Sequence, residues 1–278
     1  MQSKKSAKNL DHDKKWGEYW TTEAQDYANK LNNSYHTSRL QVIRALIPDE
    51  LYCAGKQILD FGCGDAVLFP EFLKAGANIQ GVDISEEMIK LAQERLKSLG
   101  YDPGLVRCVN VEYLKSIPTG SLDALMSFVV MIYFTDEEEK VFYQEASRIV
   151  KPGGYLILSH SNELFDMFSL NRYTVRFFKN HFVKDPSFHS DLENLFKAKD
   201  IPENPRFYNV RENPLVYKHK LARSGFEEIR QEFFNFHFAP PPLLKERSYP
   251  SILGVKEEDR WKLMFVCSTY NSCSVRKG

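Results

Sequence analysis

Short apolar segments and amphipathic segments alternate regularly between residues 57 and 159. Few folds accommodate this pattern, because apolar runs bounded by turn residues predict strands, whereas apolar residues three and four positions apart predict helices. The predicted strands are Gln57–Phe61, Asn78–Asp83, Leu105–Val111, Leu122–Val130 and Tyr155–Ser159. Strands separated by helices in this way form a parallel, doubly wound sheet, so the sequence predicts an α/β fold.

Two of the intervening helices carry clear start signals. Ser85 is a favourable N-cap residue, and Glu86 and Glu87 follow it at the positive end of the predicted helix. Thr135, with Glu138 three residues later, forms a capping box. These signals predict helices that begin directly after residues 85 and 135.

The segments on either side of the alternation differ from it. A polar, lysine-rich tail is followed by a helical pattern with several aromatic residues. Near the other end, the apolar runs Phe226–Phe238 and Trp261–Val275 predict two more strands, which bring the mostly parallel sheet to seven. The predicted organisation is a disordered tail and N-terminal helical cap (1–50), a core (51–160), a helical insertion or lid (161–222) and the last two strands (223–278).

The insertion after the fifth strand is predicted to cover a ligand site. That strand ends near Ser159, and open α/β sheets bind ligands at the carboxyl ends of their strands. About sixty residues are far more than a connection requires, and this segment is rich in Phe and Tyr. We therefore expect a mobile helical lid that selects the substrate, with a static cap on the core as the alternative.

Charge and cysteine content argue against several classes of protein. Lys and Arg together number 37, as do Asp and Glu, so the basic surplus typical of nucleic-acid-binding proteins is absent. The five cysteines are odd in number and form no CxxC pair, which argues against a disulfide framework and a structural zinc site. No secretory signal is visible, and no apolar run reaches the ~18 residues that span a bilayer. We expect a cytoplasmic protein with no metal, nucleic-acid or membrane partner; its oligomeric state is left open.

A glycine-containing turn, DFGCGDA, follows the first predicted strand. Gly62 and Gly64 allow close approach of a ligand and positive backbone φ angles. A dinucleotide site would have a third glycine where this chain has Val67. Asp60 and Asp65 are predicted to bring two carboxylates to the turn, which would repel a pyrophosphate but suit a cationic ligand.

Asp83 ends the second predicted strand, 19 residues after Gly64. A carboxylate at this place can accept hydrogen bonds from both hydroxyl groups of a ribose. The glycine turn and Asp83 together predict a site for a nucleoside that carries positive rather than negative charge.

Four motifs follow one another over about residues 55–160, namely ILDFGCGDA, GVDIS, LDALMSFVVMIYF and EASRIVKPGGYLIL. In kind and in order, they resemble the motifs of the class I S-adenosylmethionine-dependent methyltransferases. The resemblance implies a Rossmann-like fold and S-adenosyl-L-methionine as the cofactor. It implies cofactor contacts from Arg39, Asp60, Gly62, Cys63, Gly64, Asp83, Ile84, Asn110, Val111 and Phe128.

Within that set the resemblance implies separate roles. The methionine part would lie on the turn at Gly62 and Gly64, with Asp60 near its amino group and Arg39 near its carboxylate. The adenine would pack on Ile84. At position 110 the family usually has an aspartate, so in this chain the amide oxygen of Asn110 is expected to contact the adenine amine.

Candidate general bases lie at the ends of two strands. His160 ends the fifth strand and Tyr133 follows the fourth, and His237 lies in a later strand. A base is needed only if the acceptor is a hydroxyl or a protonated amine. The alternatives are that His160 merely caps its strand and that Tyr133 is structural.

The predicted function is transfer of a methyl group to an oxygen or nitrogen of a small molecule. A protein or nucleic-acid methyltransferase is the first alternative, although no Asn/Asp-Pro-Pro-Tyr/Phe motif follows the fourth strand. A methyltransferase-like module that binds partners without catalysis is the second alternative.

Overall fold

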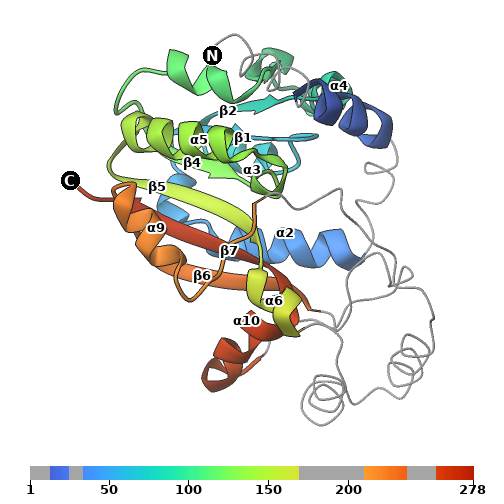
Figure 1. Cartoon of the computed structure of the whole chain (residues 1–278). Coiled ribbons are helices and arrows are strands. Elements are labelled where there is room, and N and C mark those ends of the chain that lie inside the picture. The colour runs from blue at the N-terminus through green and yellow to red at the C-terminus, as the bar shows by residue number, and fades with distance from the viewer. Residues whose placement is uncertain (1–12, 25–33, 169–209, 237–254) are drawn as a thin grey trace, which may run out of the picture.

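The computed structural model describes residues 13–24, 34–168, 210–236 and 255–278. A single twisted sheet forms the centre of the molecule, and helices cover both of its faces (Figure 1). Among the described residues, none of the helices combines the length and the apolar character that a bilayer crossing requires. Residues 169–209, most of the predicted lid, lie outside the described residues.

The sheet has seven strands in the order β3-β2-β1-β4-β5-β7-β6. Strand β7 runs antiparallel to both of its neighbours, and the other pairs are parallel. The strands are β1 (Gln57–Phe61), β2 (Asn78–Asp83), β3 (Val106–Cys108), β4 (Leu122–Ser127), β5 (Val150–Ser161), β6 (Phe226–Phe236) and β7 (Cys267–Arg276). The predicted Rossmann-like, mostly parallel, seven-stranded sheet is therefore confirmed.

Successive residues of the central strands point to opposite faces and form two separate cores. Leu59 and Leu125 face a core built with α5 (Asp136–Ile149) and α9 (Tyr217–Arg223). Ile58, Ala124 and Met126 face the other core. The helices of that second core are α2 (Ser34–Leu46), α3 (Phe69–Lys74) and α4 (Glu86–Ser98).

Both predicted helix starts are confirmed. The Ser85 side chain accepts a hydrogen bond from the backbone N–H of Met88 at 3.2 Å, and α4 begins at Glu86. Thr135 and Glu138 form the reciprocal capping box at the start of α5. Beyond β5, the short helices α6 (Glu163–Phe168) and α10 (Leu263–Val266) pack against each other.

Three predicted strands are too long. Strand β3 ends at Cys108, because the Asn110 side chain caps a 3-10 helix that starts at Val111. Strand β4 ends at Ser127, and Val129 then takes a positive φ angle of 63°. Trp261 belongs to a 3-10 helix, so β7 begins only at Cys267.

Candidate functional site

The glycine turn after β1 folds back against the end of β2. The backbone N–H groups of Gly62 and Cys63 both donate to the Val82 carbonyl, at 2.7 and 3.0 Å. Gly62 has a φ angle of 77°, and a Cβ atom there would overlap the Val130 side chain. A glycine is required at this position, and the turn leaves its backbone close to the carboxyl ends of β1, β2 and β4.

Asp83 joins that turn to the start of α4. One carboxylate oxygen accepts from the Gly64 N–H at 3.0 Å, and the other accepts from the Ser85 N–H at 2.9 Å. Burial raises the pKa of Asp83, although these backbone donors favour the ionised form. Because a carboxylate offers about four acceptor positions, Asp83 keeps capacity for ligand hydroxyl groups.

Asp60 is a buried carboxylate near the carboxyl end of β1, beside the glycine turn. Its side chain is 3% exposed, and Oδ1 has no hydrogen-bond partner among the described residues. Burial raises the pKa of Asp60 to about 7, nearby Asp83 adds to the rise, and Arg39 on α2 opposes it. The structure thus brings Asp60, Asp83 and Arg39 together, and Asp60 Oδ1 has no hydrogen-bond donor among the described residues.

The expectation that Asp65 also faces the ligand is wrong. Asp65 is buried and forms an ion pair with Arg95 of α4, whose Nε also donates to the Asp65 carbonyl at 2.9 Å. Asp65 therefore fastens the turn to α4. Of the two acids in the turn, Asp60 alone stays available for a cationic ligand.

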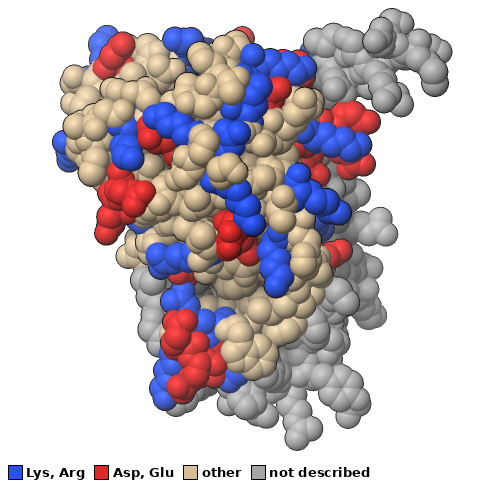
Figure 2. Space-filling model, turned by 90° about the vertical axis from the view of Figure 1, so that its left-hand side faces the viewer, with Lys and Arg blue, Asp and Glu red and all other residues tan. Residues whose placement is uncertain are grey.

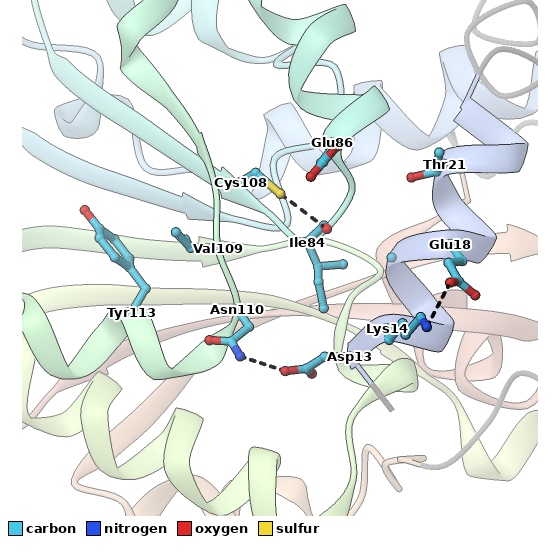
Figure 3. A pocket seen from close by; sticks show the side chains of 11 residues that line it. Asp13, Lys14, Glu18, Thr21, Ile84, Glu86, Cys108, Val109, Asn110 and Tyr113 are labelled. Carbon is cyan, nitrogen blue, oxygen red and sulfur yellow. Dashed lines mark hydrogen bonds and ion pairs between the residues drawn. The ribbon is translucent and has the colours of Figure 1, made fainter. Parts of the chain in front are cut away.

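A pocket of about 800 Å³ opens beyond Asp83, between the sheet edge and helix 13–24 (Figure 3). Ile84 and Asn110, both predicted cofactor residues, line it. The other lining residues are Asp13, Lys14, Gly17, Glu18, Thr21, Glu86, Cys108, Val109 and Tyr113. Helix 13–24 belongs to the predicted N-terminal helical cap, which was a candidate wall of the acceptor pocket, but none of its lining residues was among the predicted site residues.

The Asn110 side chain is engaged through both of its polar atoms. Its Oδ1 accepts from the Glu112 N–H at 3.2 Å, and its Nδ2 donates to Asp13 Oδ2 at 2.7 Å (Figure 3). The amide oxygen expected to contact a ligand amine therefore already caps a 3-10 helix.

Three further predicted residues have mainly apolar surroundings. Val111 is 6% exposed in one core, and Phe128 is partly buried against the other. Cys63 is buried as well, and burial raises its thiol pKa well above the ordinary value. The Cys63 side chain thus fills space in the core, so a ligand at the turn could contact Cys63 only through its backbone.

Tyr133, a predicted catalytic residue, is part of an aromatic cluster. Its ring centroid lies 4.7 Å from that of Trp16 and 5.8 Å from that of Trp20. Trp16 is buried, so this cluster holds helix 13–24 against the 3-10 turn that follows β4. Tyr133 therefore lies in the 3-10 turn that follows β4, and its catalytic role stays a prediction.

His160, the other predicted catalytic residue, is enclosed. It is 2% exposed, and its ring packs between Tyr217 and Tyr270, with centroids 4.4 and 4.9 Å away. Its Nε2 lies 3.2 Å from Ser272 Oγ, and burial together with Lys220 lowers its pKa to about 3. This environment favours the structural interpretation of His160; His237 lies outside the described residues.

Comparisons with known proteins agree with this geometry. Residues 59–158 match a family model described as a methyltransferase domain. The chain is 35% identical over 109 residues to a ubiquinone biosynthesis O-methyltransferase of Chromobacterium violaceum, over 39% of this chain and 46% of the relative. A protein of the same name from Methylococcus capsulatus is 28% identical, over 48% of this chain and 53% of the relative. The chain thus spans about half the length of the curated relatives that it matches.

Solved structures support the same fold. Magnesium protoporphyrin IX methyltransferase from Synechocystis, with bound SAH, has a TM-score of 0.58 at 17% identity, over 96% of this chain and all of its own. A SAM-dependent methyltransferase from Archaeoglobus fulgidus has a TM-score of 0.52 at 19% identity, over 86% of this chain and 94% of its own. Residues 59–158 are thus similar to a methyltransferase domain, and the chain shares the fold of these solved methyltransferases.

Proposed function

We propose that this chain binds S-adenosyl-L-methionine and transfers its methyl group to an oxygen or nitrogen of a small molecule. The observation that carries the proposal is the Asp60 carboxylate, which is buried at the glycine turn with one oxygen unpartnered among the described residues. A cationic ligand would stabilise this carboxylate, whereas a pyrophosphate would be repelled by it. S-adenosylmethionine carries a sulfonium and an ammonium group and no phosphate.

The three parts of the cofactor fit three neighbouring features. The methionine part would lie on the backbone of Gly62 and Gly64, with its ammonium at Asp60 and its carboxylate at Arg39. The ribose hydroxyls would donate to Asp83. The adenine would then enter the pocket beyond Ile84, because Ile84 directly follows Asp83 and lines that pocket.

A small aromatic hydroxyl compound is the acceptor that we propose. Curated relatives that this chain matches include O-methyltransferases of ubiquinone biosynthesis. On the face displayed in Figure 2, basic side chains lie among acidic and neutral ones, which suits a nucleic-acid backbone poorly. All five cysteines are free thiols, in keeping with the predicted cytoplasmic location.

The protein's part in the reaction is alignment and the exclusion of water, since the bound cofactor supplies a methyl group with a good leaving group. Tyr133 is the better of the two predicted bases, because it lies beside the covering helix at the sheet's carboxyl edge. His160, with its pKa lowered to about 3, would be a weak base at neutral pH.

Calorimetry with S-adenosylhomocysteine and with NAD tests the cofactor assignment. We expect micromolar binding of S-adenosylhomocysteine, about −8 kcal/mol, and no signal with NAD. Labelled S-adenosylmethionine should then methylate phenolic small molecules but not a peptide mixture or RNA. NAD binding without S-adenosylhomocysteine binding would contradict the proposal. Cofactor binding without transfer to any acceptor would favour a silent binding module.

A further inference from the structure

The pocket beyond Asp83 has a carboxylate that none of the predicted cofactor residues supplies. Asp13, at the start of helix 13–24, accepts a hydrogen bond from Asn110 Nδ2 at 2.7 Å. In Figure 3 the Ile84 side chain points toward this pair of residues. Asp13 and Asn110 thus form the wall of the pocket that a flat group lying on Ile84 would face.

The hydrogen bonds already present determine what this wall can offer to a ligand. Asn110 Nδ2 donates to Asp13, and Asn110 Oδ1 accepts from the Glu112 N–H. Asp13 uses one position of one oxygen in this contact and, as a carboxylate, keeps further acceptor positions and no donor. The wall is therefore suited to a ligand group that donates hydrogen bonds.

The other acids of the pocket are placed differently. Glu18 lies 3.8 Å from Lys14 in an ion pair, and Glu86 is exposed on the opposite side of the pocket. Asp13 is the pocket carboxylate that a neighbouring amide holds in a fixed position.

We propose that Asp13, held by Asn110, accepts a hydrogen bond from the 6-amino group of the cofactor's adenine and so selects adenosine over a 6-oxo base. This assignment rests on the proposed function and adds a residue of helix 13–24 to the binding site. A 6-oxo base would bring a carbonyl oxygen against the Asp13 carboxylate, and two acceptors without a hydrogen between them repel.

Calorimetry with S-adenosylhomocysteine and S-inosylhomocysteine, which carries the 6-oxo base, tests the assignment. The unaltered chain should bind S-adenosylhomocysteine at least about tenfold more tightly. Asp13→Asn keeps the shape of the side chain but removes its charge, and its amide can donate to a 6-oxo group. This variant should lose roughly tenfold in S-adenosylhomocysteine affinity and most of the discrimination between the two ligands.

Two further variants make the test specific. Glu23→Gln removes the same charge from the same helix but lies outside the pocket lining, so its affinities should match those of the unaltered chain. The double variant Asp13→Asn/Asn110→Asp swaps the two residue types, so that the carboxylate lies at position 110 and the amide at position 13. It should restore much of the preference for the adenine compound. Thermal midpoints report whether each variant folds.

The possible outcomes distinguish failure of the Asp13 assignment from failure of the proposed function. If the unaltered chain prefers the adenine compound and Asp13→Asn behaves identically, the assignment of Asp13 is overturned while the proposed function stands. Equal losses in Asp13→Asn and Glu23→Gln would also overturn it, because they indicate a general effect of charge. No binding of either compound to the unaltered chain would contradict both.

Discussion

Asp60 gives a pH-dependent signature of ligand binding at the scale of a single residue. Its pKa is raised from 3.8 to about 7 by burial, so the unliganded chain holds a proton on this carboxyl below about pH 7. A bound ammonium would favour the ionised form and expel that proton. We expect release of about one proton per S-adenosylhomocysteine near pH 6 and almost none near pH 8. Calorimetry in buffers of different ionisation enthalpy measures the number of protons released on binding. The variant Asp60→Asn should release none.

The same shift predicts the sign of a stability change. The folded-state pKa lies above the unfolded value, so the contribution of protonated Asp60 is fully present below about pH 4. It is lost as the pH rises through about 7. In denaturant titrations, the free energy of unfolding of the unaltered chain should therefore decline as the pH rises through about 7, and that of Asp60→Asn should not. If Asp60→Asn shows the same decline, groups other than Asp60 cause it.

Asp83 is expected to serve both the ligand and the fold. Asp83→Ala removes the acceptor that holds the N–H groups of Gly64 and Ser85, as well as the proposed ribose contact. We expect S-adenosylhomocysteine affinity to fall by roughly 1.5–3 kcal/mol, with a lower melting temperature of the unliganded chain. Asp83→Asn keeps one acceptor oxygen and should lose less of both. Unchanged affinity in both variants would show that Asp83 does not bind the ribose.

At this scale the sequence was informative where a residue acts within its own motif. The spacing between Gly64 and Asp83 predicted that both lie at one site, because the carboxyl ends of neighbouring parallel strands meet at one edge. It could not predict that Asp65 pairs with Arg95 or that Asn110 holds Asp13. Those contacts join residues 30 and 97 positions apart, and side-chain packing alone determines them.

Helix 13–24 is the element that links the fold to the proposed site. Trp16 and Trp20 pack against Tyr133, while Asp13 and Gly17, on the adjoining face of the same helix, line the pocket. The helix has three turns and would be marginal in isolation, so these contacts must hold it in place. Its position in turn decides how completely the pocket is enclosed.

Trp16→Ala should therefore weaken ligand binding without direct loss of a ligand contact. The buried ring is 5% exposed, and its removal should loosen the helix rather than the sheet. We expect S-adenosylhomocysteine affinity to fall by about tenfold and hydrogen exchange over residues 14–20 to accelerate. Tyr133→Phe keeps the aromatic packing and is the matched control. If Trp16→Ala binds normally while its helix exchanges faster, the helix does not contribute to the pocket.

Element boundaries show a second limit of sequence reasoning. The alternation from residue 57 to residue 159 located the five parallel strands, and the capping signals at Ser85 and Thr135 located two helix starts. The predicted ends of β3 and β4 were too late, because the apolar residues after them continue into 3-10 turns. Hydrophobicity reports burial, and buried turns have the same apolar character as buried strands.

At the scale of the whole molecule, the order of the strands in the sheet could not be predicted from the sequence. The fold class follows from the alternation, but β7 lies between β5 and β6 and runs antiparallel to both. The proposed site uses the other half of the sheet, since its residues follow β1, β2, β3 and β4. Ligand binding should therefore affect this half of the sheet more than the half that contains β6 and β7.

Binding should stabilise the whole chain while protecting only one part of it. A ligand at 100 times its Kd adds about 2.7 kcal/mol to folding, which for a chain of this size raises the melting temperature by roughly 5–10 °C. We expect this rise with S-adenosylhomocysteine and none with NAD. In hydrogen exchange below the melting transition, protection should increase at the glycine turn, at residues 83–88 and over helix 13–24. The strands β6 and β7 should change little, because local opening there exposes no proposed ligand contact. A melting shift with uniform protection across the sheet would place the ligand elsewhere or indicate a global rearrangement, and either result would count against the site at Asp60 and Asp83.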